Sequence, residues 1–347
     1  MSGRREARRS PAPGLYGSWL TRGLKLSTCA VQSTEAKVYQ MTRKAGKLAD
    51  LIDMENPAAV LEEVHHILKL ISPDLDGRKL VQVFQDVSNL FQGRYPGYRP
   101  CNTWYHDLKH TTDCFLALAR LIHGATVNGL ELTSRYVSLG LIAALLHDTG
   151  YIQRDDEMTG TGAQFTIIHV ERSIEFMRQY FVDGGYAEEE FRFAANCLKC
   201  TGLTVNIGRE VQFLNRDNEV LGKMLGVADL LGQMADRTYL EKLPFLFQEF
   251  REAGVPGFSS ELELLEKTPG FWEFIQQRFA SELDNLDRYM RDHFRVRWGI
   301  DQDLNRQTVE TNIAYLKHVL KNSGPDYARH LRRGNLMHHF RKYYPKA

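Results

Sequence analysis

Two histidines near the middle of the sequence are spaced so that they could bind a metal ion or move a proton. His106 and His110 lie four residues apart. In a helix that begins near Tyr105 they share one face, with Cβ atoms about 5–6 Å from each other. Asp113 follows His110 by three residues, where a carboxylate could accept the ring N–H of a metal-bound histidine and fix its tautomer. Alone, such a pair is also typical of a solvated helix face.

Two further polar positions interrupt strongly apolar segments. His147-Asp148 follows the apolar stretch 137–146, and a helix this apolar is expected to be surrounded by other helices. Asp229 lies within a second apolar run. A buried carboxylate is costly unless it meets a cation or a hydrogen-bond network. Metal binding meets that need, and a capping pair before Gly150 is the alternative for His147-Asp148.

These positions together supply two imidazoles, His110 and His147, and two carboxylates, Asp148 and Asp229. Such a mixed set suits Zn²⁺, Mn²⁺, Fe²⁺ or Ni²⁺ and leaves coordination positions open for water and substrate. It is a poor match for Ca²⁺, which prefers oxygen ligands only.

The segments that carry these residues have helical periodicity, and alternating apolar and polar runs are short and rare. The spacing predicts helices over 108–122, 135–147, 165–181, 219–234 and 237–253, and one long helix over 271–294. No linker-like stretch divides them. The sequence therefore predicts an all-α fold with one large domain, residues 31–325.

Composition is that of a globular chain, with 347 residues, 43% hydrophobic and 25% charged. The net charge of +1 hides basic ends: residues 1–34 carry +5 and residues 328–347 carry +6, which leaves −10 for the body. We expect a flexible basic arm over 1–30 and a basic tail over 326–347. An acidic body makes nucleic acid an unexpected partner.

The compartment follows from the cysteines and from the apolar runs. Five scattered cysteines do not form a disulfide framework, and no apolar stretch approaches the roughly 20 residues that span a bilayer. The N-terminus also lacks the apolar core of a secretory signal. We therefore expect a cytoplasmic protein without membrane contact.

The order of the candidate ligands carries a resemblance. His110, then His147-Asp148, then Asp229 is similar to the H…HD…D signature of the HD superfamily of metal-dependent phosphohydrolases. The segment from Tyr105 through His110 to Asp113 resembles the first metal motif of class I cyclic-nucleotide phosphodiesterases. Asp229, followed by Arg237 and Phe250, resembles their last metal-ligand helix and the helix after it. The resemblance covers about residues 95–255 and implies a single multi-helix bundle of the HD/phosphodiesterase type.

The resemblance also implies roles for individual residues. His110, His147, Asp148 and Asp229 would hold one or two divalent ions (Zn²⁺, Mn²⁺, Fe²⁺, Ni²⁺ or Mg²⁺), with Asp148 placed to bridge a second ion and counted as catalytic. His106 would be the general acid, and Asp113 would orient a ligand. His169 would reach the second metal or the phosphate, and Arg237 would contact the phosphate. The expected activity is a phosphodiesterase acting on a small phosphate ester of nucleotide type.

Departures from the phosphodiesterase pattern keep alternatives open. Tyr151 stands where those enzymes have a further histidine, and Asp107 where they have asparagine. No equivalent of their glutamine and aromatic purine clamp is evident over 255–347. The alternatives are a phosphomonoesterase or nucleotidase of the HD superfamily, a catalytically idle nucleotide-binding regulator, and a helical interaction module whose polar groups are satisfied by protein alone.

Overall fold

Helices joined by turns and short 3₁₀ segments make up the structure, a computed structural model that describes residues 46–344 except 74 and 76. The α-helices are α2 (Pro57–Ile71), α3 (Arg78–Phe91), α4 (Leu108–Val127), α5 (Ser134–Leu146), α6 (His169–Asp183), α7 (Glu188–Lys199), α8 (Ile207–Glu210), α9 (Arg216–Met234), α10 (Tyr239–Glu252), α11 (Glu261–Ser281), α12 (Tyr289–Trp298), α13 (Leu304–Ser323) and α14 (Leu336–Tyr343). Across the described residues, strand-like pairing is confined to one isolated bridge between Tyr98 and Arg154. The predicted all-α fold class is confirmed.

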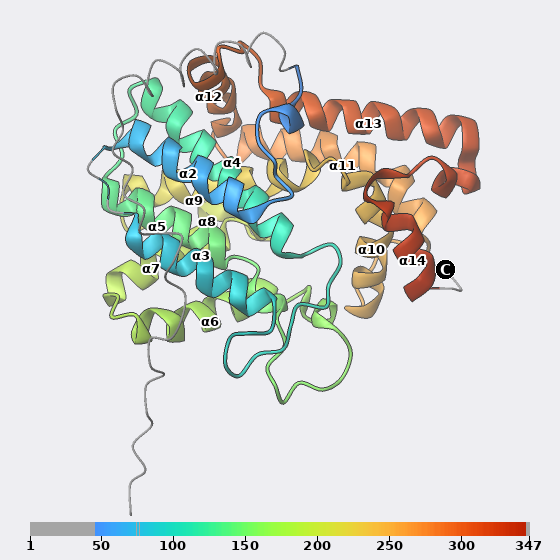
Figure 1. Cartoon of the computed structure of the whole chain (residues 1–347), viewed down its shortest axis with the longest axis horizontal. Coiled ribbons are helices and arrows are strands. Elements are labelled where there is room, and N and C mark those ends of the chain that lie inside the picture. Colours follow the sequence, from blue (N-terminus) through green and yellow to red (C-terminus); the bar gives the residue numbers. More distant parts are fainter. Residues whose placement is uncertain (1–45, 74, 76, 345–347) are drawn as a thin grey trace, which may run out of the picture. The chain divides into compact units, whose positions relative to one another are not determined.

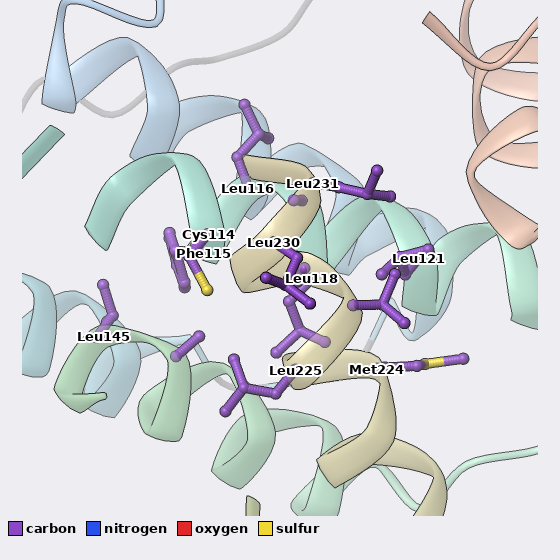
Figure 2. Packing of buried hydrophobic residues seen from close by; sticks show 14 of the residues in the cluster. Cys114, Phe115, Leu116, Leu118, Leu121, Leu145, Met224, Leu225, Leu230 and Leu231 are labelled. Atoms are coloured by element: carbon purple, nitrogen blue, oxygen red, sulfur yellow. The ribbon is translucent and has the colours of Figure 1, made fainter. Parts of the chain in front are cut away.

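Helices α4 and α9 form the centre of the core, and α2, α5, α7 and α12 pack around them (Figure 1). Figure 2 shows α9 crossing α4, with Leu225 and Leu230 of α9 and Phe115 and Leu118 of α4 among the buried side chains around the crossing. These four side chains are at most 3% exposed. Burial on nearly every side of α4 and α9 explains why their sequences are apolar over several turns.

Helix starts follow side-chain caps that the sequence carries. Asn56 accepts the backbone N–H of Ala58 at the start of α2, and Pro57 occupies the first helical position. Asp107 caps α4 in the same way by accepting the backbone N–H of His110. The helix therefore begins at Leu108, where the predicted helical period 108–122 begins, and not near Tyr105, because the aspartate side chain ends the preceding loop at position 107.

The predicted single helix over 271–294 is also wrong. The chain leaves α11 at Ser281 and enters α12 at Tyr289. Asp284 and Asn285 between them both have a φ of 52°, the left-handed region that no continuing α-helix tolerates. Apolar spacing continues through the turn because Leu283 and Leu286 are buried in it, so periodicity alone could not locate the break.

Two glycines allow helices to approach more closely than any other residue would. A Cβ on Gly124 of α4 would overlap the carbonyl oxygen of Tyr289 in α12. A Cβ on Gly150 would overlap the carbonyl oxygen of His169 at the start of α6. Gly150 therefore sets how close α6 lies to the turn that follows α5.

Of the two basic ends of the chain, the C-terminal one lies largely within the described residues. The expected arm over 1–30 lies outside the described residues. In the basic segment 326–347, residues 336–343 form α14, whose Met337 and Phe340 are buried and whose Phe340 ring packs on Phe245 of α10. Within the described part of the chain, every helix is too short or too polar to cross a membrane.

Candidate metal centre

The four residues expected to bind metal come from three helices that the core packs together. His110 lies in the first turn of α4, and His147 and Asp148 directly follow α5. Asp229 lies in the second half of α9. All four side chains are buried. The apolar core thus brings together polar groups that are far apart in sequence.

Nitrogen and oxygen atoms of these residues converge on one point. Nε2 of His110 is 3.2 Å from Nε2 of His147. It is also 3.1 Å from Oδ2 of Asp148 and 3.1 Å from Oδ1 of Asp229. Nε2 of His147 is 3.4 Å and 3.7 Å from the same two oxygens.

These separations fit a shared ion. Donor atoms bound at about 2.0–2.2 Å stand about 3.0–3.6 Å apart in octahedral or tetrahedral geometry. The ligand atoms of His110, His147 and Asp229 all lie within 4.8 Å of one another. This group could hold a metal ion, and Asp148 is close enough to both imidazoles to join it.

The histidine orientations suit metal binding as well. Nδ1 of His147 is 2.7 Å from the carbonyl oxygen of Ala144, an acceptor, so in the neutral imidazole that binds metal Nδ1 carries the proton and Nε2 presents its lone pair to the cluster. Oδ2 of Asp148 is buried and accepts no well-formed hydrogen bond from the described residues. A buried carboxylate oxygen without a donor is the kind of atom that a cation would satisfy.

The electrostatics indicate that the cluster needs positive charge. Burial lowers the pKa of the His110 imidazole, but the facing carboxylates of Asp148 and Asp229 outweigh burial and raise that pKa to about 10. Burial opposes ionisation of Asp229, yet hydrogen bonds from His110 and His147 hold its pKa below the ordinary value. Protonated imidazoles balance the carboxylates here, and a divalent cation on the same atoms would do the same.

His106 lies beside the cluster but is not in α4, because Asp107 is the cap of that helix. Its ring centroid is 5.8 Å from that of His110. Its Nδ1 is 2.7 Å from Oε2 of Glu249 in α10. A carboxylate at Nδ1 keeps a proton on that nitrogen and fixes the plane of the ring, so Nε2 faces the other way.

Glu249 is a site residue that sequence reasoning missed. Its Oε1 accepts the backbone N–H groups of Trp104 and Tyr105, at 3.0 Å and 2.8 Å, while Oε2 contacts His106. It is 4% exposed. The signal was present, because Glu249 lies between Phe247 and Phe250 and is a buried acid in an apolar run, as Asp229 is.

Gln233 was missed for a different reason, since it has no charge. One turn beyond Asp229 on α9, its Nε2 is 3.3 Å from Oδ1 of that carboxylate. Its Oε1 accepts the hydroxyl of Tyr105 at 2.8 Å. Gln233 therefore connects the α9 carboxylate to the loop that carries His106.

Tyr151 fills the position where a histidine stands in the resembling enzymes. Its ring stacks against His106, with centroids 4.2 Å apart, and against His169, with centroids 4.8 Å apart. Its hydroxyl is 3.4 Å from Nε2 of His106. Burial raises the pKa of this phenol well above its ordinary value, so Tyr151 stays neutral.

His169 lies at the edge of the cluster, as the sequence analysis expects. Its Nε2 is 3.9 Å from Oδ1 of Asp148. Its Nδ1 is 2.7 Å from the carbonyl oxygen of Thr166, so Nδ1 carries the proton and the Nε2 lone pair is available. Burial lowers the pKa of His169, which favours the neutral form that binds metal.

Two expected site residues are not arranged as predicted. Oδ2 of Asp113 accepts from Nζ of Lys109 at 2.6 Å, and Nδ1 of His110 has no partner among the described residues, so Asp113 does not orient His110. Lys109 competes for Asp113 because it lies one turn away on the same helix. Arg237 is exposed after α9, and its side chain makes no described contact with the cluster.

Comparison with known proteins gives the family of the chain. No curated protein matches the sequence. Residues 97–291 match the Npun_R2479-like family, and this range contains His106, the four cluster residues and Glu249. Because the match covers more than half of the 347 residues, the chain belongs to the Npun_R2479-like family.

Proposed function

We propose that this protein is a metal-dependent phosphohydrolase, and more specifically a phosphodiesterase for a small ester of nucleotide type. The observation that carries the proposal is the convergence of His110, His147, Asp148 and Asp229 beside a second, non-ligating histidine, His106. The order of these residues resembles the HD superfamily, and the spacing of His106 and His110 resembles the class I cyclic-nucleotide phosphodiesterases.

Each residue of the cluster has a part in the proposed chemistry. His110, His147, Asp148 and Asp229 would hold a divalent ion, and His169 would reach a second one. A bound ion would supply Lewis-acid polarisation of the phosphoryl oxygens and a water of lowered pKa. The protein would exclude bulk water, because all four ligands are buried.

His106 is proposed as the general acid. Glu249 holds its Nδ1–H, so a second proton on Nε2 would be the one transferred to the leaving oxygen. Glu249 would stabilise the doubly protonated ring before the transfer. This assignment favours a phosphodiester, because its alkoxide leaving group needs a proton as it departs.

A specific observation favours a second candidate, a nucleotide-binding regulator that turns nothing over. The Tyr151 hydroxyl lies 3.4 Å from Nε2 of His106, the atom that would transfer the proton. In that case the metal pocket would bind phosphate while Tyr151 obstructs the acid. A phosphomonoesterase or nucleotidase, whose substrate also releases an alkoxide, is the other alternative. For each of these activities we propose a cytoplasmic location.

Metal analysis of purified protein and a substrate panel test the proposal together. The panel holds cyclic mononucleotides, cyclic dinucleotides, mononucleotides and bis-p-nitrophenyl phosphate, each with Mn²⁺, Zn²⁺, Fe²⁺, Ni²⁺ and Mg²⁺. We expect bound metal and turnover of at least one diester. Asp148→Ala and Asp229→Ala should lose metal and activity while remaining folded, whereas the surface variant Asp183→Ala should keep both.

The outcomes separate the candidates. Metal without turnover of any ester would favour the regulator. Turnover of monoesters alone would favour the nucleotidase. Full metal content in Asp148→Ala and Asp229→Ala would contradict a metal centre at this position.

A further inference from the structure

A buried cation elsewhere in the core has no matching anion. Arg120 of α4 is 1% exposed, and its guanidinium faces the ring of Phe294 in α12 at 5.3 Å from the centroid. Its Nη1 makes one long hydrogen bond, 3.4 Å, to Oδ1 of Asn305 at the start of α13. Its Nε and Nη2 are buried and have no partner among the described residues.

Other buried cations of this structure are neutralised directly. Lys109 contacts Asp113 at 2.6 Å, and Lys242 contacts Asp107 at 2.9 Å. Arg120 forms no ion pair with any described residue, although burying a charge without a partner is costly.

The three carboxylates that act most strongly on the charge of Arg120 have other hydrogen-bond or ion-pair partners. Glu63, Asp113 and Asp303 each act on its charge. Glu63 makes two contacts to Arg297, at 3.2 Å and 3.1 Å. Asp113 is paired with Lys109, and Asp303 accepts the backbone N–H that begins α13. None of these carboxylates forms an ion pair with Arg120, although Oδ1 of Asp113 is buried and has no described partner.

Neighbouring histidines do not supply the missing charge. Nδ1 of His293 in α12 is 3.2 Å from Nδ1 of His123 in α4, and Nε2 of His293 is another buried atom without a described partner. Burial holds the pKa of both imidazoles below the ordinary value, so both are neutral at pH 7. Burial also lowers the pKa of Arg120 to about 10, which still leaves it charged at that pH.

We propose that Arg120 binds a small monovalent anion, chloride, between α4, α12 and α13, with Nε and Nη2 as the donors. A neutral water could accept those N–H groups but would leave the charge unbalanced. Arg120 is 1% exposed and one side of its guanidinium faces the Phe294 ring, which favours a monatomic ion over a larger oxyanion. Arg120 is ten residues beyond His110 on α4, about 15 Å along the helix, so this site is separate from the metal centre.

Crystals of the full-length protein grown with NaBr in place of NaCl give the most direct test. Bromide replaces chloride and scatters anomalously at its absorption edge. We expect an anomalous peak within hydrogen-bond distance of Nε or Nη2 of Arg120. An ordered water, or a protein atom, at that position without an anomalous peak would overturn the proposal.

Thermal unfolding tests the same site in solution. At constant ionic strength, replacing sodium gluconate with NaCl should raise the Tm, and the Tm should keep rising with the logarithm of chloride concentration once the site fills. Arg120→Met should lose this dependence. Arg278→Met is the matched control, because Arg278 is as buried but donates to the carbonyl oxygens of Gly202 and Leu203. It should keep the dependence.

Each outcome counts for or against the site. Equal chloride dependence in Arg120→Met and Arg278→Met would overturn it, as would a wild-type Tm that ignores chloride. If Arg120→Met does not fold, Arg120→Lys keeps the charge and should show a weaker dependence, and the bromide map of the wild-type protein decides alone.

Discussion

His106 and His110 are neighbours of the same residue type that the structure places in different chemical environments. His110 faces two carboxylates with Nε2 and is buried. Nδ1 of His106 contacts the carboxylate of Glu249, and the His106 side chain is 13% exposed. A histidine whose Nδ1 is held by a carboxylate, and whose other nitrogen is directed elsewhere, is suited to proton transfer. The different partners of the two rings therefore suit His106 to the proposed role of general acid and His110 to the proposed role of metal ligand.

The role of His106 can be tested with two leaving groups. His106→Asn should lower the rate about 10²–10⁴-fold for an alkoxide leaving group and much less for p-nitrophenolate, which departs without a proton. Metal content, measured on the same preparation, should not change. His110→Ala is the contrast, since it should lose metal and both activities. Release of metal by His106→Asn would instead make His106 a ligand.

Glu249 should affect the rate of the reaction by acting on His106. Glu249→Gln keeps an oxygen for the Trp104 and Tyr105 N–H groups but removes the charge that stabilises a protonated His106. We expect a loss of about 10–100-fold for the alkoxide substrate, by analogy with partners of metal-bound histidines. The loss should be much smaller for p-nitrophenolate, which departs without a proton. An equal loss for both leaving groups would mean that Glu249 only holds the loop.

His169 should govern any second ion. Its Nε2 lies 3.9 Å from Asp148, a distance that one shared ion could bridge. His169→Ala should lower the metal stoichiometry, or raise about 10–100-fold the metal concentration that half-saturates the rate. His318→Ala, an exposed histidine of α13, is the control. Unchanged stoichiometry and metal dependence would remove His169 from the site.

At the scale of the elements, the sequence was informative wherever a polar residue interrupts an apolar helix. His147, Asp148 and Asp229 could be predicted in this way, because a buried polar group needs a partner. Glu249 carries the same signal in α10. Its partner, His106, lies in a loop 143 residues earlier, and no helical period reports a contact of that separation. Asp113 also lies four residues after Lys109, a spacing that favours an ion pair on a helix, and in the structure Lys109 occupies its carboxylate.

The junction of α6 with the turn after α5 is the element contact on which the centre depends. Gly150 follows Asp148 by two residues and packs against the His169 carbonyl, so Gly150→Ala should push the two apart. We expect a loss of about 1–3 kcal/mol of stability from the overlap, and lowered metal affinity. Gly270→Ala in α11 has open space around its Cβ and should not lower metal affinity. Denaturant unfolding and metal titration measure both effects. Equal behaviour of the two variants would contradict a tight junction at Gly150.

At the scale of the whole molecule, α4 connects two polar clusters through an apolar core. His110 lies near its N-terminal end, and Arg120 and His123 lie in its second half. α12 and α13 supply the second cluster with His293 and Asn305, and both helices pack against α4 or α9. A change of charge at His123 or His293 should therefore alter the stability of the core that also contains the candidate metal ligands.

Acid should destabilise the protein through the His123–His293 pair. The pKa of His123 is lowered to about 4 by burial, with further lowering by Arg297 of α12 and His66 of α2. That of His293 falls well below 6.5 by burial and by Arg120 of α4, His123 and Arg297. Below pH 6.5 the unfolded chain binds protons that the folded protein excludes, so the free energy of unfolding should fall from pH 6.5 towards pH 4.

The variant His123→Gln separates the effect of the histidine pair on stability from that of carboxyl groups whose protonation stabilises the folded protein. Asp113 and Asp303 have pKa values raised to about 6, chiefly by burial, so their protonation favours the folded state as the pH falls below 6. These carboxyls are unchanged in His123→Gln, which keeps a neutral partner for His293. Its unfolding free energy, from urea titrations at pH 7, 6, 5 and 4.5, should fall less steeply with decreasing pH than that of the wild type. The difference in slope should correspond to the uptake of at most about one proton fewer on unfolding. His318→Gln should follow the wild type. If His123→Gln fell as steeply, the imidazole would already be charged in the folded protein and the buried pair would not be neutral.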